Sequence, residues 1–353
     1  MKTAAKKWIK FIVSAVIVVV TLSLIQALLM PKYAVGIVEG AFVAEYYGEV
    51  KDHDVIFVGD CEVYENFSPI VLFRDYGINS YIRGSAEQYI FQSYYLLEDT
   101  LRYETPEVVI FNIQSLQFPE ANNEAYNRMS IEGMKWSSSK VGAIMSSMRE
   151  EEHFLDYVFP ILRYHSRWSE LNKNDFTYMF KTKKVSHNGY YMRVDVRPAT
   201  DVPPGRPLPN YDFDERSWKY LDMMVELCEK KGIELLLIKA PSLYPYWYPE
   251  YDAQVVEYAE KHGLTYINFL DENIQKETGI DYNTDTYDMG LHMNLSGAEK
   301  LANWLGKYLT ETVGLADRRG EKDLAARWEE KIAFYEADKK AQYEKYGMTE
   351  KVN

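Results

Sequence analysis

The sequence is poor in cysteine. Its 353 residues include only Cys61 and Cys228, and no Cys-x-x-Cys pair or Cys/His cluster with zinc spacing occurs. A disulfide framework is therefore excluded, although one bond between the two cysteines stays open. We expect no metal and no other cofactor.

Positive charge is also scarce. Lys and Arg total 40 against 53 for Asp and Glu, which gives a net charge of -13. A protein that binds nucleic acid through its phosphates needs a basic surface, so we do not expect that partner. The 47% hydrophobic and 26% charged composition excludes global disorder and can supply one substantial core.

Long apolar runs are absent except near the N-terminus. Residues 11–30 run for 20 residues without a charge, enough to cross a hydrocarbon core of ~30 Å. Four lysines and no acidic residue precede this run, which is typical of a cytoplasmic flank. We predict a cytoplasmic tip and transmembrane anchor over 1–32, with residues from 31 onward exported; residues 31–353 carry a charge of -17.

A cleaved signal peptide is the alternative. Signal peptides have apolar regions of about 7–15 residues and small residues at the cleavage site. Here the residues from Leu28 to Lys32 are large or charged. The sequence therefore favours an uncleaved, single-pass anchor in the cell membrane.

Strand-like and helix-like segments alternate after the anchor. Short apolar runs predict strands at 55–58, 79–84, 106–116, 233–240 and 264–270. Helical spacing predicts helices at 86–102, 215–231 and 250–262. This order is typical of an α/β fold, a three-layer α/β/α sandwich with a central parallel sheet and ligands beyond the carboxyl ends of its strands.

Three segments lie outside this alternation. Residues 33–50 form a linker with a short helix over 33–47, and 51–314 form the main domain. Residues 117–205 are too long for a plain loop and predict a helical insertion or cap over the sheet. Residues 315–353 predict a charged C-terminal helix for packing or oligomer contact, with apolar residues at helical spacing.

The residues that carry chemistry lie at the two ends of the main domain. Gly59-Asp60-Cys61-Glu62 follows the first predicted strand, and Asp288 and His292 lie just before a late helix. They supply a nucleophile, a base and a carboxylate that orients the base, which is the general logic of a catalytic triad.

These two blocks resemble the SGNH/GDSL hydrolase superfamily, which has a strand-Gly-Asp-Ser block and an Asp-x-x-His block before a helix. The turn GDCE is also similar to that of membrane-anchored members such as the D-alanyl-lipoteichoic acid biosynthesis proteins. The resemblance covers roughly 54–116 and 215–310, and it implies an SGNH-like fold with acyl chemistry.

The resemblance assigns roles residue by residue. It makes Cys61 the nucleophile, His292 the base and Asp288 the residue that orients it. Asp285 is a second candidate for that role, because Asp288 precedes His292 by four residues and the family spacing is three. A helix N-terminus and a nearby imidazole lower the pKa of a thiol, whereas Asp60 and Glu62 raise it.

An oxyanion would need hydrogen-bond donors. The resemblance implies the backbone N–H groups of Cys61 and Gly84, with Gly84 as the second-block glycine. A third donor is usually a side-chain amide at the end of the third strand, where Asn112 and Gln114 both qualify.

The insertion holds candidate substrate contacts. Arg163, His165 and Trp168 are suited to stacking on a sugar ring and to holding an anionic group, as are the neighbouring Arg167, His187 and Tyr190. Core packing is the alternative for the aromatic residues. We predict a packing role for Cys228, and no metal site at Asp52, His53 and Asp54.

The sequence thus predicts a membrane-anchored, extracytoplasmic esterase or acyltransferase that acts on a cell-envelope polysaccharide or teichoic acid-like polymer through an acyl-Cys61 intermediate. The resemblance implies a membrane-bound O-acyltransferase as a donor partner. One alternative is a non-catalytic member that binds glycan or scaffolds such a complex. Another is a structural anchor that acts through the C-terminal helix.

Overall fold

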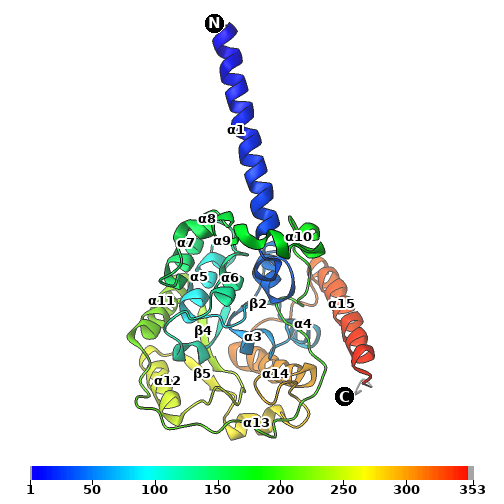
Figure 1. Ribbon diagram of the computed structural model, residues 1–353. Coiled ribbons are helices and arrows are strands. Elements are labelled where there is room, and N and C mark those ends of the chain that lie inside the picture. The colour runs from blue at the N-terminus through cyan, green and yellow to red at the C-terminus, as the bar shows by residue number, and fades with distance from the viewer. Residues whose placement is uncertain (1, 349–353) are drawn as a thin grey trace.

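Five parallel strands form the centre of the computed structural model, which describes residues 2–348 (Figure 1). The strand order is β2-β1-β3-β4-β5, and every neighbouring pair is parallel. The strands are β1 (Val55–Gly59), β2 (Ser80–Gly84), β3 (Val108–Asn112), β4 (Glu234–Lys239) and β5 (Thr265–Asn268). Strands β2 to β5 fall within segments that the sequence predicts as strands, and β1 extends one residue, Gly59, beyond its predicted segment.

Both faces of the sheet are buried. Every residue of β1, β2 and β3 is buried, which explains why β1 and most of β3 are apolar without alternation, while β2 also buries the polar Ser80 and Arg83. Successive side chains still point to opposite faces, so Phe57 belongs to one core while Ile56 and Val58 belong to the other.

Helices cover each face and complete the predicted three-layer sandwich. One core includes residues of α4 (Pro69–Tyr76), α14 (Leu295–Tyr308) and α15 (Lys322–Tyr346). The other includes residues of α5 (Ile90–Thr100), α11 (Glu215–Lys231) and α12 (Pro249–His262). Shorter elements complete the body: η4 (Ile113–Gln117), α13 (Glu272–Thr278) and η6 (Leu309–Val313).

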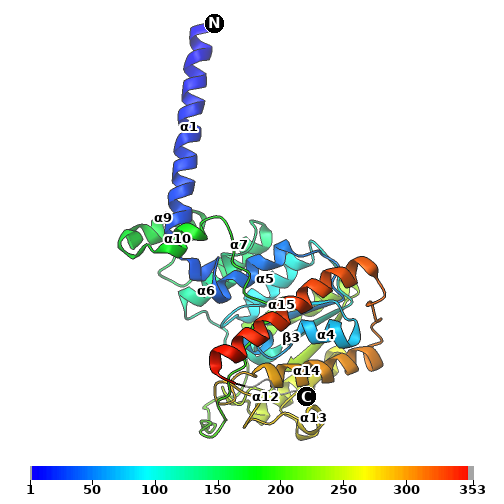
Figure 2. The same cartoon turned by 90° about the vertical axis from the view of Figure 1, so that its right-hand side faces the viewer.

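Helix α1 (Lys2–Leu29) extends away from the body (Figures 1 and 2). Its segment Ala5–Leu29 is long and apolar enough to cross a membrane, and no other helix among residues 2–348 meets that description. Met1 of the predicted anchor lies outside the described residues.

The linker is not the single short helix that the sequence predicts. It is broken into η1 (Lys32–Ala34), η2 (Val38–Ala41), α2 (Phe42–Glu45) and η3 (Tyr46–Gly48). The chain folds back so tightly that a Cβ on Gly40 would lie 1.7 Å from the carbonyl oxygen of Tyr33. Such an approach interrupts a continuous helix and requires glycine.

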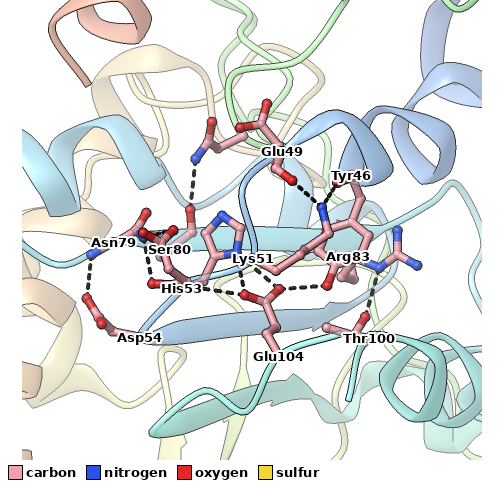
Figure 3. Close-up of polar contacts among 12 residues, drawn as sticks. Tyr46, Glu49, Lys51, His53, Asp54, Asn79, Ser80, Arg83, Thr100 and Glu104 are labelled. Carbon is pink, nitrogen blue, oxygen red and sulfur yellow. Dashed lines mark hydrogen bonds and ion pairs between the residues drawn. The ribbon is translucent and has the colours of Figure 1, made fainter. Parts of the chain in front are cut away.

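Polar contacts tie this linker to the sheet (Figure 3). The hydroxyl of Tyr46 donates to Glu104 at 2.6 Å, and His53 Nδ1 lies 2.9 Å from the same carboxylate. Asp54 accepts the backbone N–H of Asn79, and Asp52 pairs with Arg327. His53 thus faces Glu104, whereas Asp52 and Asp54 both contact Asn79 and Arg318.

The insertion is helical only in part. Its helices are α6 (Glu124–Ile131), α7 (Ser138–Ser147), α8 (Phe154–Val158), α9 (Ile161–Tyr164), η5 (His165–Glu170) and α10 (Lys173–Thr177). The chain after them is not a cap. Tyr190, Met192 and Val194 are buried in the core that α4 and α14 share, so this stretch is part of the body.

Helix α15 packs along the body as the apolar spacing predicts. Leu324, Trp328 and Tyr335 are buried, and Trp328 stacks on Phe73 with ring centroids 4.5 Å apart. The helix is shorter than the predicted segment 315–353, of which 349–353 lie outside the described residues.

Candidate active site

A sharp turn places Cys61 at the carboxyl end of β1. The short helix α3 (Cys61–Tyr64) starts two residues after the strand, and the Asp60 side chain caps it by accepting the N–H of Glu62 at 3.1 Å. A Cβ on Gly59 would lie 2.4 Å from Cγ2 of Val63, so only glycine fits this turn. The location matches the strand-end position where α/β folds bind ligands.

Cys61 and His292 line one cavity of about 700 Å³. Segments that follow β1, β2 and β3 form most of its wall, together with η2, α6 and the loop before α14. Beyond the two predicted catalytic residues, the lining includes Glu39, Glu65, Glu87, Tyr89, Gln114, Phe118, Tyr126, Met129 and Leu291. The structure thus brings together two residues that lie 231 positions apart in the sequence.

Asp288 holds the imidazole of His292. Its Oδ2 lies 2.6 Å from His292 Nδ1, and its Oδ1 accepts the backbone N–H of His292 at 2.8 Å. Asp285 instead pairs with Lys300 at 2.6 Å. The geometry therefore favours Asp288 over Asp285 as the orienting residue.

The loop between Asp288 and His292 accommodates one residue more than the family spacing. The Thr286 hydroxyl accepts the N–H of Gly290 and donates to the carbonyl of His292, each at 2.8 Å. Met289 has a φ of +70°, and Gly290 has a φ of +95°. This tight turn lets the carboxylate reach both the ring and the backbone of the histidine.

The imidazole of His292 and the thiol of Cys61 lie within range of each other's charge. His292 Nε2 is buried and has no well-formed hydrogen bond among the described residues. The thiol of Cys61 is nevertheless close enough that each group shifts the pKa of the other. A loose contact of this kind is common in unliganded sites and tightens when substrate binds.

Burial, rather than the helix N-terminus, has the largest effect on the pKa of the Cys61 thiol. Burial raises the pKa of Cys61 to about 11, although His292 lowers it, and Asp60 and Glu65 raise it further. The expected lowering by the imidazole and the expected raising by Asp60 are both present, but loss of water around the sulfur has a larger effect than either. The thiol holds its proton at neutral pH.

The surroundings of the imidazole act on its pKa in both directions. Burial lowers the pKa of His292, but Glu65, the hydrogen bond to Asp288 and the Cys61 sulfur, when it is a thiolate, raise it, and the net direction is upward.

Glu65 is a site residue that the sequence patterns did not single out. Its Oε1 lies 4.0 Å from His292 Nδ1, and it accepts a hydrogen bond from the hydroxyl of Tyr287. The ring of Tyr287 is nearly parallel to that of His292, with centroids 5.9 Å apart. The only signal in the sequence is spacing, because Glu65 follows Cys61 by about one helical turn.

The two candidate amide donors, Asn112 and Gln114, differ in whether their hydrogen-bonding groups already have partners. Asn112 donates to Asp60 at 3.2 Å and to Glu62 at 3.0 Å, and its oxygen accepts the N–H of Ala240. Gln114 lines the cavity, and its buried amide nitrogen and oxygen have no hydrogen-bond partner among the described residues. Gln114 is therefore the amide that is free to stabilise an oxyanion.

Asn112 belongs instead to a buried polar network under the nucleophile. Lys239 Nζ lies 3.0 Å from Glu62 Oε2, and both side chains are almost fully buried. Because an unpaired buried charge is costly, this network fixes the floor of the site. Gly84 pairs in register with Gly59 at the end of β2 and is not among the residues that line the cavity, whereas the following residues 86–89 are.

The predicted substrate contacts do not reach this cavity. Arg163 pairs with Glu124 at 2.5 Å, His165 Nδ1 lies 3.1 Å from the Leu162 carbonyl oxygen, and Trp168 is exposed. All three lie on elements that contact the end of α1. His187 pairs with Asp338 of α15 at 2.9 Å and is not among the residues that line the cavity.

Cys228 has the packing role that the sequence predicts. It is buried in the core between α11 and the sheet, whereas Cys61 packs against the opposite core. Both cysteines are free thiols, so the open possibility of a Cys61–Cys228 disulfide is not realised.

Comparison with known proteins adds little to this geometry. No family model matches the chain, and no curated protein does. Among solved structures, a Bacteroides fragilis protein described as a putative acylhydrolase is similar, with 14% identity and a TM-score of 0.37. The match covers 76% of this chain and 95% of that one.

Proposed function

We propose that this chain is a membrane-anchored, extracytoplasmic SGNH-like enzyme that transfers or hydrolyses acyl groups on a cell-envelope polymer. The observation that carries the proposal is the meeting of Cys61, His292 and Gln114 in one cavity, with Asp288 behind the imidazole. These groups supply a nucleophile, a base and an oxyanion donor, the set that acyl transfer requires.

The proposed reaction has two steps. The sulfur of Cys61 attacks an ester carbonyl while His292 Nε2 accepts the thiol proton, so that a C–S bond forms. The ester C–O bond then breaks, and His292 returns the proton to the leaving alcohol. In the second step a polymer hydroxyl or water attacks the thioester, gives up its proton through His292, and frees Cys61.

The lining of the cavity limits the acyl group. Five carboxylate residues line it, Glu39, Asp60, Glu62, Glu65 and Glu87, with no Lys or Arg in the lining. Lys239 pairs with Glu62, and burial raises the pKa of Asp60 to about 7, so Glu39, Glu65 and Glu87 supply most of the negative charge. Like charges repel in a low-dielectric site, so an anionic acyl group is disfavoured. We propose a neutral or cationic acyl group and a polysaccharide or teichoic acid-like acceptor, with a membrane-bound O-acyltransferase as the donor partner that the family resemblance implies.

Hydrolysis of p-nitrophenyl acetate by the full-length chain in detergent tests this proposal. Cys61→Ala should abolish turnover and the acyl adduct that mass spectrometry detects on Cys61. Cys228→Ala is the matched control, because it removes the other buried cysteine outside the cavity. Equal turnover by wild type and Cys61→Ala would end the enzymatic proposal.

A non-catalytic role is the second candidate, and the raised pKa of Cys61 favours it. In that role the acid-lined cavity binds part of a glycan or scaffolds an acyltransferase complex. Alkylation distinguishes the two candidates: an enzyme's thiol should be protected by a slow acyl substrate, whereas a scaffold's thiol should react equally fast with and without it.

A further inference from the structure

Large apolar side chains gather on the surface at the base of α1. Six of them have exposed fractions between 48% and 72%, and we call this group the collar: Leu155, Phe159, Leu162, Trp168, Phe176 and Phe180. They come from α8, α9, η5, α10 and the residues that flank them. Soluble surfaces carry scattered apolar residues, but a gathered group of this size marks an interaction site.

The collar surrounds the place where α1 enters the body. Helix α1 contacts α9, η5 and α10, and Figures 1 and 2 show α9 and α10 beside its base in both views. A bilayer that contains α1 therefore ends at this face of the body. This continuity with the membrane-spanning helix favours lipid as the occupant of the collar.

Two basic side chains, Arg167 and Lys32, stabilise the junction between α1 and the body. Arg167 donates to the carbonyl of Leu29 at 2.5 Å, and Lys32 donates to the carbonyl of Ala27 at 2.8 Å. Asp175 on α10 lies 3.2 Å from Arg167 and 3.9 Å from Lys32. The last carbonyls of a helix lack partners within it, so these contacts stabilise the end of α1 and hold the collar beside it.

The segment that carries the collar has a charge opposite to that of the whole protein. Residues 155–184 contain six basic and three acidic residues, a net charge of +3 in a protein of net charge -13. Leu, Phe and Trp combined with Lys and Arg are typical of segments that lie in the membrane interface. The basic side chains suit the phosphates of lipid headgroups.

We propose that the collar inserts into the headgroup region of the bilayer and holds the body against the membrane. This inference rests on the anchoring role of α1 in the proposed function, but not on the acyl chemistry. It also gives Arg163, His165 and Trp168 a setting at the membrane surface in place of a substrate site.

The collar would also fix the cavity near the lipid surface. Glu39 on η2 and Tyr126 and Met129 on α6 line the cavity, and both elements pack against η1, which follows α1. One wall of the site is thus built from the segment that leaves the membrane, which suits a donor that is carried in or on the bilayer.

Fluorescence in nanodiscs tests the collar. The full-length chain with Cys61→Ser and Cys228→Ser receives one new cysteine, at Phe176→Cys or Phe180→Cys, which carries a polarity-sensitive label. The discs contain phosphatidylcholine and phosphatidylglycerol, and size-exclusion isolation of discs with bound protein shows that α1 is inserted. Val256→Cys is the matched control, because Val256 is 40% exposed on α12, far from α1 (Figure 1).

The labels at 176 and 180 should show blue-shifted emission, protection from aqueous iodide and quenching by nitroxide lipids, while the label at 256 behaves as in water. Iodide access at 176 and 180 equal to that at 256 would overturn the proposal and leave the collar for a protein partner. Thermal melts of the labelled variants verify folding. Since no activity is measured, this outcome is independent of the Cys61 assay.

Discussion

Asp288 contacts His292 at two points, through the ring nitrogen and through the backbone N–H. One carboxylate therefore fixes both the tautomer and the position of the imidazole. In a catalytic triad the carboxylate orients the imidazole and stabilises its charged form. An Asn in place of the Asp keeps the shape of the side chain but loses this function.

We expect Asp288→Asn to lower kcat for ester hydrolysis by up to about 10⁴-fold, because the wrong tautomer would then face the thiol. The melting temperature should change little, since this carboxylate is partly exposed. Asp285→Asn is the control. It loses the ion pair to Lys300 and should keep its activity, and a larger loss of kcat in that variant would reverse the assignment.

Substitution of Gln114 should lower catalysis, whereas substitution of Asn112 should lower stability. Gln114→Ala removes an amide without a hydrogen-bond partner among the described residues, so kcat should fall about 10²- to 10³-fold with the fold intact. Asn112→Ala removes one donor each from Asp60 and Glu62 and leaves the N–H of Ala240 without its acceptor, so it should lower the free energy of unfolding by about 1–3 kcal/mol. Urea titration and steady-state kinetics measure both. Unchanged kinetics in Gln114→Ala would remove it from the oxyanion site.

The pKa of about 11 for Cys61 predicts how alkylation depends on pH. Only the thiolate reacts, so well below that pKa the rate with iodoacetamide should rise about tenfold per pH unit. The rise should continue past pH 9, whereas an ordinary cysteine levels off near its pKa of about 8.5. Mass spectrometry of labelled peptides gives the rate at Cys61. A plateau below pH 8 would show that the thiolate forms at neutral pH.

Much of the fold follows from local patterns. The apolar runs around Val55–Gly59 and Glu234–Lys239 are continuous because both faces of the sheet are covered, and Gly232 ends α11 in a left-handed conformation. Such signals depend on neighbouring residues only. The stretch around Tyr190 is buried through contacts with distant strands and helices, and no local period predicts that packing.

The site was predictable where a motif existed. The blocks around Cys61 and His292 indicated the cavity, but the choice between Asn112 and Gln114 depends on hydrogen bonds to Asp60, Glu62 and Ala240. Composition could suggest that Trp168 binds a sugar ring, yet its location at the base of α1 depends on how the insertion folds. Burial of the thiol likewise depends on the tertiary structure.

Glu65 gives the last prediction. Its carboxylate is 4.0 Å from Nδ1 of His292, and its charge helps to raise the pKa of that imidazole. A base acts only when deprotonated, so a raised pKa moves the rise in activity toward alkaline pH. Glu65→Gln removes the charge and keeps the shape, and the pKa of His292 should fall.

In a plot of kcat/KM against pH, the rise on the acidic side should therefore shift to lower pH in Glu65→Gln. Glu87→Gln is the matched control, because Glu87 also lines the cavity and is not among the groups with the largest effects on the pKa of His292. Tyr287→Phe removes the hydrogen bond to Glu65 and tests whether the tyrosine matters only through the carboxylate. If this rise moves equally in Glu65→Gln and Glu87→Gln, the effect belongs to the overall charge of the cavity, and Glu65 has no special part in setting the base.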